Sequence, residues 1–213
     1  MVPIAGRPLL EHTVVWLRDH GFTDLVLTLH HKPEAIRDHF GDGSRFGVRI
    51  QYSLEAELLG TSGALLPVRS FLSDETFLVM YGDNLTNCDL ARPLRLHREN
   101  DALVTVSVFY REDVTKSGMV CIEPDGRITA FREKPSAEEV TSHYVSAGIV
   151  FCEPRIFDYI PAGFSDFGRD VFPALLAHGE PLYADCMPEK VRWADTLDDY
   201  RELQQLAEAG QLL

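Results

Sequence analysis

Apolar and polar residues follow two spacings along the chain, and its first half predicts a regular succession of helices and strands. Residues 8–20 carry Leu10, Val14 and Leu17 at a helical spacing, between a first-turn proline and Gly21. Apolar runs predict strands at 25–29, 48–52, 77–81 and 102–109, and helical spacing predicts helices at 33–40, 61–72 and 89–99. Repeated β-α-β units favour a parallel sheet covered by helices on both faces.

The rhythm changes after residue 109, where two short apolar runs, 119–122 and 128–131, are joined by a Pro-Asp-Gly-Arg turn. Asp-Gly between such runs predicts an antiparallel hairpin. Further strands are expected at 145–152, 182–186 and 191–193, and helices at 155–160, 169–178 and 197–209. With neither a repeat nor a linker in view, we expect one α/β domain over residues 1–213, with a small antiparallel insertion.

Composition excludes several classes of protein. The chain has 213 residues, 45% hydrophobic and 25% charged, which is typical of a globular protein with a substantial core. Its formal net charge of −13 disfavours nucleic acid and anionic membranes as partners. The apolar runs are too short to span a membrane, and the first residues predict no signal peptide. An anionic ligand would therefore need local cations or a metal ion to overcome the overall field.

The four cysteines predict neither a disulfide framework nor a zinc site. Cys88, Cys121, Cys152 and Cys186 form no C-x-x-C pair, and none has a histidine at a zinc-ligand spacing. We expect them to be buried, free thiols of a protein in a reducing compartment, which indicates a cytoplasmic location.

Four motifs contain residue types that bind ligands, and each also has a purely structural interpretation. The first, Tyr81-Gly82-Asp83-Asn84, ends the predicted strand 77–81. In open α/β sheets ligands bind at the carboxyl ends of the strands, where Asp83 could hold Mg²⁺ against a phosphate. The alternative is ordinary turn chemistry, because glycine, aspartate and asparagine all favour such corners.

The second motif is the glycine-rich run 57–65. Gly60 and Gly63 predict uncovered backbone N–H groups ahead of a helix, which can receive a base edge or an anion. The alternative is a capped helix start, with Thr61 or Ser62 as the N-cap.

The third and fourth motifs place charged residues at strand ends. Glu133 can accept hydrogen bonds from sugar hydroxyls, and Lys134 can meet a phosphate, whereas the alternative is a solvated turn. Asp195 is a candidate second metal ligand. The alternative is an N-cap for the closing helix, with Asp198 and Asp199 complementing its first turn.

In this order along the chain, six motifs together resemble the sugar-1-phosphate nucleotidyltransferase family, which includes mannose-1-phosphate guanylyltransferases and glucose-1-phosphate thymidylyltransferases. The matching runs are 2–12 (VPIAGRPLLEH), 59–65 (LGTSGAL), 82–84 (GDN), 131–135 (FREKP), 146–149 (SAGI) and 193–196 (WADT). The resemblance implies a Rossmann-like, three-layer fold with a mixed sheet.

The resemblance also implies a reaction. An oxygen of a sugar 1-phosphate attacks the α-phosphorus of a nucleoside triphosphate in line, pyrophosphate leaves, and a nucleotide-sugar forms. By position, Asp83 and Asp195 would hold Mg²⁺, Glu133 would hold the sugar, and Lys134 would hold its phosphate. Asp83, Lys134 and Asp195 are thus the expected catalytic residues.

Further substrate contacts are implied by position. Leu59 and Gly60 would line the base, with Glu55 or Glu57 nearby, and Gly82 belongs to the same substrate site. Gly148 would let the backbone approach the sugar. Ser146 stands where many members carry asparagine, so one sugar contact differs here.

Members of the family also carry a buried strand and a glycine-rich, triphosphate-binding loop ahead of the run that begins here at Val2. We therefore expect an N-terminally incomplete domain, with little catalysis by these 213 residues alone. One alternative is a non-catalytic sugar-nucleotide-binding or regulatory relative. Another is a glycosyltransferase that uses Asp83, although the Glu-Lys-Pro and Trp-Ala-Asp matches argue against it. A homo-oligomer is compatible with the sequence, which leaves the base and the sugar open.

Overall fold

The computed structural model of the chain describes residues 1–189, 191–194 and 196–212, which form two compact units. Both units are discontinuous along the sequence. Unit 1 comprises Met1–Ala56, Tyr81–Asp89 and Glu189–Leu213, and unit 2 comprises Glu57–Met80 and Leu90–Pro188. The chain therefore passes between the units four times, and the predicted site residues are divided between them.

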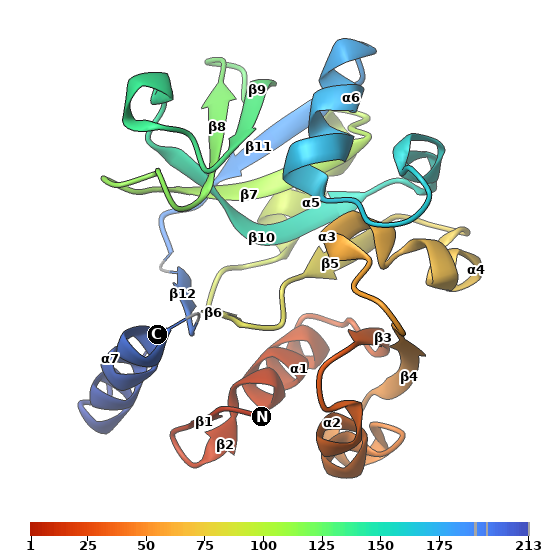
Figure 1. Ribbon diagram of the computed structural model, residues 1–213, viewed down its shortest axis with the longest axis vertical. Helices are drawn as coiled ribbons and strands as arrows, with labels where there is room; N and C mark the ends of the chain where they lie inside the picture. Colours follow the sequence, from red (N-terminus) through yellow and green to blue (C-terminus); the bar gives the residue numbers. More distant parts are fainter. Residues whose placement is uncertain (190, 195, 213) are drawn as a thin grey trace. The chain divides into compact units, whose positions relative to one another are not determined.

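Unit 2 is built on one mixed sheet (Figure 1). Its strands are β5 (Phe77–Met80), β7 (Val104–Tyr110), β8 (Gly118–Ile122), β9 (Ile128–Glu133), β10 (Tyr144–Cys152) and β11 (Leu182–Cys186). The order is β11-β7-β10-β8-β9, and β5 also pairs with β10. Only β7 and β11 run parallel, so the predicted mixed sheet and the β8–β9 hairpin are confirmed, whereas a mainly parallel sheet is wrong for this unit.

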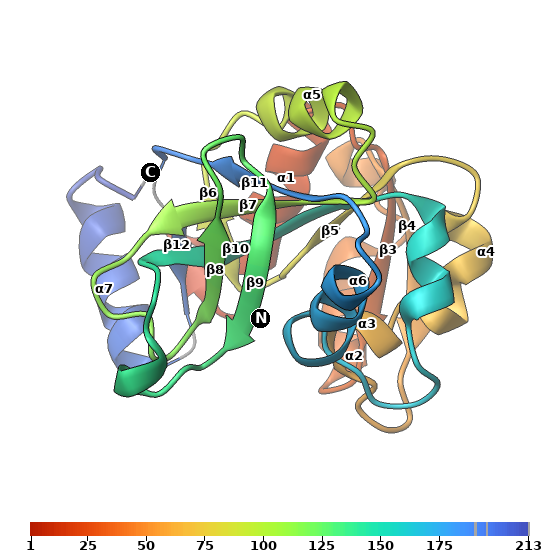
Figure 2. The ribbon, with the colours of Figure 1, turned by 90° about the horizontal axis from the view of Figure 1, so that it is seen from above.

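Helices cover both faces of this sheet. Figure 2 shows α5 (Ala91–Glu99) on one side and α6 (Phe172–Ala177) on the other. Alternation along β7 explains why: Val104, Val106 and Val108 join the apolar cluster that contains residues of α6, while Thr105 bonds to His97 of α5. The remaining helical segments are α3 (Gly60–Gly63), η2 (Leu66–Val68), α4 (Arg69–Leu72), η3 (Ala137–Glu139), η4 (Pro154–Tyr159) and η5 (Phe167–Val171).

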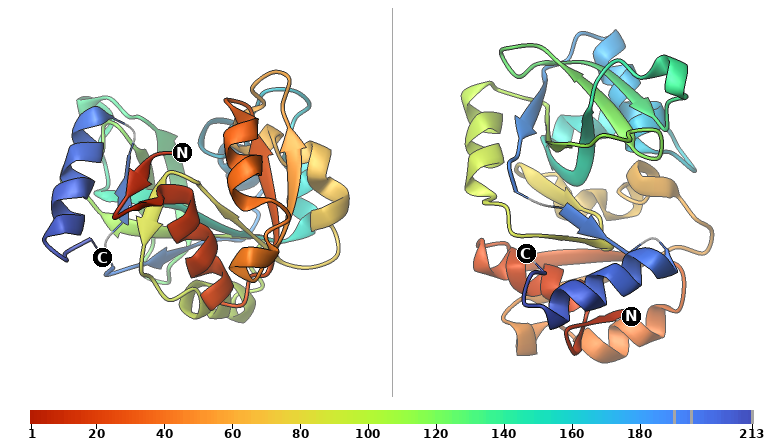
Figure 3. Two further views of the ribbon diagram at one scale, coloured as in Figure 1. Left: turned by 90° about the horizontal axis from the view of Figure 1, so that it is seen from below. Right: turned by 90° about the vertical axis from the view of Figure 1, so that its left-hand side faces the viewer.

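Unit 1 pairs its strands only two by two. Within the described residues, β1 (Pro3–Ile4) pairs with β2 (Arg7–Pro8), β3 (Asp24–Leu29) with β4 (Arg49–Leu54), and β6 (Asn84–Thr86) with β12 (Val191–Trp193). The β3–β4 pair is parallel. The helical segments are α1 (Leu9–Asp19), α2 (Pro33–Phe40), η1 (Ser44–Phe46) and α7 (Leu197–Glu208), and Figure 3 gives two further views of them.

Several predicted elements need correction. The helix expected at 61–72 is broken into α3, η2 and α4, because Pro67 removes a backbone donor from its interior. The segment expected as a helix at 155–160 is the 3₁₀ helix η4, and the expected helix at 169–178 is the π-helical turn η5 followed by α6. The short strands β1, β2 and β6 were not predicted.

The cysteine prediction holds in part. All four thiols are free, Cys88 and Cys152 are buried, and Cys121 is half-buried. Cys186 is exposed, because it is the last residue of β11. Among the described residues, no helix has both the length and the apolar character that a membrane crossing requires.

Candidate active site

The end of β9 presents a carboxylate and an ammonium group side by side. Lys134 follows the strand directly and has a left-handed backbone with φ of +49°. Its amide donates to the Ser117 carbonyl at 3.0 Å, and the next residue, Pro135, is buried. This conformation is uncommon for a residue with a β-carbon, and it turns the chain sharply where the exposed Lys134 begins the loop.

Strand register brings Glu133 and Ser146 into one row across three strands. Gly118 of β8 lies opposite Glu133 of β9, and Val145 of β10 lies opposite Met119 of β8. Continuing this register by one residue would place Ser146 opposite Gly118. Directly opposed residues share a face of the sheet, so Glu133 and Ser146 lie on the same face with a glycine between them.

Two glycines confine the Glu133 side chain. A β-carbon on Gly118 would lie 3.0 Å from Glu133 Oε2, and one on Gly168 would lie 2.9 Å from the same oxygen. Each would also collide with the Phe131 ring, at 2.5 and 2.6 Å. Neither glycine has a left-handed backbone, so both are needed for space rather than for conformation.

Partial burial sets the electrostatics of Glu133. Burial raises the pKa of the Glu133 carboxyl above its ordinary value, and the neighbouring Lys134 and Arg169 oppose this shift. The negative charge of Asp166 adds to it. A half-buried carboxylate with two nearby cations is suited to accept hydrogen bonds from a polar ligand next to an anionic group.

The backbone of β10 is irregular beside Ser146. The pairing of β10 with β7 shifts between Ser146 and Val150, and Gly148 within the bulge is buried, with φ of +66°. The Gly148 amide donates to Ser146 Oγ at 3.2 Å. Such bulges redirect side chains at functional sites, and the Ser146 hydroxyl oxygen is already in use as an acceptor.

The glycine-rich loop 59–63 is docked on a distant segment of the chain. The amides of Ser62 and Gly63 both donate to the Ser165 carbonyl, at 3.0 and 3.1 Å, and the Thr61 amide donates to Asp166 Oδ1 at 3.2 Å. The expectation of uncovered amides is therefore wrong at these three positions. The predicted N-cap at Thr61 or Ser62 is also wrong, because the residue that precedes α3 is Leu59. The first amides of α3 are instead bonded by Ser165 and Asp166, from a distant part of the same chain.

Gly60 fits this docking for two reasons. Its φ of +77° lies in the left-handed region, and a β-carbon there would lie 2.4 Å from the Ser165 carbonyl oxygen and 3.3 Å from the ring of Phe164. Leu59 is half-buried and accepts from the Ser165 amide at 2.9 Å, while Phe164 is 60% exposed. The loop therefore lies beside the exposed ring of Phe164, and its backbone is held by these hydrogen bonds.

Gly82 and Asp83 lie in unit 1, at the exposed turn before β6. The Asn84 amide donates to the Tyr81 carbonyl at 3.3 Å and closes this turn, and the Asn84 carbonyl accepts from Thr13 Oγ1 of α1. These bonds therefore hold the backbone of the turn that contains Asp83 against α1.

The remaining residues that the sequence predicts for the site lie in different parts of the chain. Glu55 belongs to unit 1 and Glu57 to unit 2, and Asp195 lies outside the described residues. Thr196 caps α7 in a reciprocal pair with Asp199, at 3.1 Å from Thr196 Oγ1 to the Asp199 amide. The predicted acidic first turn, with Asp198 and Asp199, is confirmed. The alternative of Asp195 as the N-cap is wrong, because Thr196 is the N-cap.

Four residues of the site in unit 2 were not predicted from the sequence: Gly118, Ser165, Asp166 and Gly168. One local signal was present, because an aspartate ahead of the apolar run 171–176 is typical of a helix start. Nothing in the local pattern indicates that Asp166 caps a helix about a hundred residues away.

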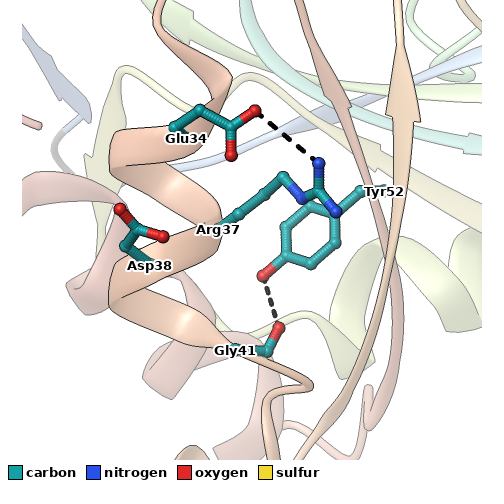
Figure 4. A pocket seen from close by; sticks show the side chains of 5 residues that line it. All are labelled: Glu34, Arg37, Asp38, Gly41 and Tyr52. Carbon is teal, nitrogen blue, oxygen red and sulfur yellow. Dashed lines mark hydrogen bonds and ion pairs between the residues drawn. The ribbon is translucent and has the colours of Figure 1, made fainter.

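A separate groove in unit 1 contains none of the predicted residues (Figure 4). It encloses about 300 Å³ between α2 and β4 and is lined by Glu34, Arg37, Asp38, Gly41 and Tyr52. The Tyr52 hydroxyl donates to the Gly41 carbonyl at 2.7 Å, and the Arg37 guanidinium lies 5.9 Å from the Tyr52 ring centre and 3.7 Å from Glu34. These contacts fasten α2 to β4.

Comparison with known proteins gives matches over most of the chain. A family model described as "Nucleotidyl transferase" matches residues 1–209. A UTP–glucose-1-phosphate uridylyltransferase of Synechocystis is 38% identical over 92% of the chain and 53% of its own length. A mannose-1-phosphate guanylyltransferase of Mycobacterium tuberculosis is 36% identical over 84% of the chain and 50% of its own length.

The fold has solved counterparts. The structure of a putative glucose-1-phosphate thymidylyltransferase from Bacillus anthracis has a TM-score of 0.86 at 23% identity and covers 96% of the chain and 84% of its own. The chain spans about half the length of the curated relatives that it matches. From the family match over residues 1–209 and these two sequence relatives, the chain belongs to the nucleotidyl transferase family.

Proposed function

We propose that this chain carries the substrate-binding framework of a sugar-1-phosphate nucleotidyltransferase, which joins a nucleoside triphosphate and a sugar 1-phosphate into a nucleotide-sugar and pyrophosphate. The observation that carries the proposal is the half-buried Glu133 carboxylate between Gly118 and Gly168, directly before Lys134. The names of the two sequence relatives support the same reaction class.

The proposed roles follow from the chemistry of each group. Glu133 accepts hydrogen bonds from sugar hydroxyls, and Lys134 neutralises the sugar phosphate. The docked loop at Leu59 and Gly60 presents an apolar edge to the base, and the bulge at Gly148 lets the sugar approach the backbone. In-line transfer needs no covalent intermediate, so these residues act by positioning and by charge neutralisation.

Magnesium fits the donor chemistry of Asp83. Mg²⁺ in enzymes is held by one or two carboxylates together with substrate phosphates, and Asp83 is an exposed carboxylate at a fixed turn. Asp83 and Asp195 would hold the ion. Bound there, it would neutralise phosphate charge during transfer.

The test is a panel of triphosphates and sugar 1-phosphates assayed by pyrophosphate release. The panel is run on the protein that carries this chain. We expect turnover with at least one substrate pair, and we expect Asp83→Asn to lower kcat by at least about 100-fold. Asp74→Asn, at an exposed carboxylate before β5, is the matched control and should leave kcat unchanged.

Two results would count against the proposal. Absence of turnover by this protein with every substrate pair would defeat it. Calorimetric binding of a nucleotide-sugar without turnover would instead support the non-catalytic relative.

A further inference from the structure

The two parts of the proposed site in unit 2 meet at one short segment, residues 165–168. Residues 165–167 bond to the loop 59–63, and Gly168 lies so near Glu133 that a β-carbon on it would be 2.9 Å from Oε2. The sequence places these three segments far apart, so their meeting is a property of the fold.

The contacts to the loop are dense and buried. Ser62 Oγ and Ser165 Oγ lie 2.9 Å apart in a fully buried pair, and the Ser165 carbonyl accepts two loop amides. Asp166 Oδ1 accepts from both the amide and the hydroxyl of Thr61, at 3.2 and 3.0 Å. The Thr61 hydroxyl in turn accepts from the Phe167 amide at 3.0 Å. Hydrogen bonds to a charged acceptor are among the stronger ones in proteins.

The contact to Glu133 follows two residues later. Gly168 lies in the π-helical turn Phe167–Val171, and a β-carbon there would displace Phe131 or the Glu133 carboxylate. Single π-helical turns occur frequently at functional sites. Asp170 Oδ2 accepts from the Asp166 amide at 2.8 Å and ties the start of this turn to its end. A shift of Asp166 is therefore transmitted to Gly168 through one short, bonded turn.

We propose that residues 165–168 are the common support of the base-side loop and of the sugar-side carboxylate, with Asp166 and Gly168 as positioning residues. The inference rests on the proposed function, because it assigns the two supported elements to the two substrates. It predicts that damage at either end of the segment disturbs both elements.

The first experiment measures hydrogen exchange without any substrate, on the 213-residue chain. Asp166→Ala should speed exchange of the amides in residues 59–65 about tenfold, the effect of losing one charged hydrogen bond. Asp166→Asn keeps an oxygen acceptor and should restore most of the protection. Asp125→Ala is the control, because Asp125 accepts a backbone amide in the hairpin turn at the opposite end of β8 and β9. It should leave residues 59–65 unchanged.

The second experiment uses Gly168→Ala in both exchange and kinetics. We expect faster exchange in residues 59–65 and a rise of about tenfold in KM for both the triphosphate and the sugar 1-phosphate, with a smaller change in kcat. A variant that raises the sugar KM alone and leaves the loop exchange unchanged would overturn the shared support, as would an unchanged loop in Asp166→Ala. Altered exchange in these variants, together with no turnover in the substrate panel described under Proposed function, would retain the support and defeat the proposed function.

Discussion

Unit 2 and unit 1 stabilise their strands in different ways. In unit 2, β10 pairs with β5, β7 and β8, and one apolar cluster extends from β7 to α6. In unit 1, each described strand has one strand partner, and two smaller clusters centre on Val14 and on Leu85. A strand bonded on both edges is harder to open than one bonded on a single edge.

This difference concerns function as well as stability. Glu133 and Ser146 are paired with neighbouring strands in the sheet of unit 2, and Gly148 lies in the bulge of β10. Asp83 follows β5 and stands in the less extensively paired unit 1. Rigid elements hold binding residues more precisely than isolated strand pairs, so we expect Glu133 and Ser146 of unit 2 to be better ordered than Asp83 of unit 1.

The largest expected effect comes from truncating one buried phenylalanine in each unit. Phe151 of β10 is 1% exposed and Phe40 of α2 is 2% exposed. Each change to alanine should lower the free energy of unfolding of its own unit by about 3–5 kcal/mol. Native-state hydrogen exchange should show Phe40→Ala opening β3 and β4 while β7 and β10 keep their protection.

The control for this pair is Phe164→Ala, at a side chain that is 60% exposed, which should have little effect on stability. Equal loss of protection in both units after Phe40→Ala would break the comparison, because the units would then unfold as one.

A change of pH is expected to have a smaller effect on the free energy of unfolding, and this effect should arise in unit 2. His97 is 2% exposed, with Nδ1 at 2.9 Å from Thr105 Oγ1 and Nε2 at 3.1 Å from Glu153 Oε1. Burial lowers the pKa of His97 below its ordinary value of about 6.5, although Glu153 opposes the shift. The folded state then binds fewer protons than the unfolded state, so the free energy of unfolding falls as the pH drops through about 6.5.

Denaturant unfolding from pH 7.5 to pH 5, followed in unit 2 by hydrogen exchange, measures this slope. His97→Gln should flatten it, whereas His31→Gln, at an exposed histidine of unit 1, should keep it. The same slope in the His97 variant would contradict the assignment.

The smallest effect should distinguish backbone strain from substrate binding. Lys32 and Lys134 both precede a proline and have φ of +48° and +49°, one in each unit. Glycine at either position should relieve the left-handed strain and stabilise its unit by about 0.5–1 kcal/mol after its own entropy cost. Only Lys134→Gly should raise the KM for the sugar 1-phosphate. A matching rise in Lys32→Gly would argue against a role for the Lys134 ammonium group.

Local patterns were sufficient to predict much of the fold. The helix at 33–40 was predicted to the residue, because Pro33 begins it and Gly41 ends it. The hairpin at residues 118–133 followed from its Asp-Gly turn. The break near Pro67 was readable in principle, since a proline interrupts any helix that it falls inside.

The parts of the site that were missed depend on contacts between distant segments. Thr61 and Asp166 are 105 residues apart, and neither has a neighbour in sequence that reveals the other. Gly118 and Gly168 are ordinary glycines until the Phe131 and Glu133 side chains are placed against them. The roles of Glu133, Lys134 and Ser146 were suggested by resemblance and stay predictions, although the register that aligns Glu133 with Ser146 emerges only from the sheet.

The docking of loop 59–63 on Ser165 also determines which residues must be replaced together in a chimera with another member of the family. A β-carbon added at Gly60 would lie 2.4 Å from the Ser165 carbonyl oxygen, and one added at Gly63 would lie 2.4 Å from the Gly163 carbonyl oxygen. A transplanted loop that lacks these two glycines would therefore collide with the backbone of residues 163–165. We expect a chimera to take on the substrate range of a relative only when residues 59–63 and 163–168 are replaced together. The two segments form one structural unit, although they are far apart in the sequence.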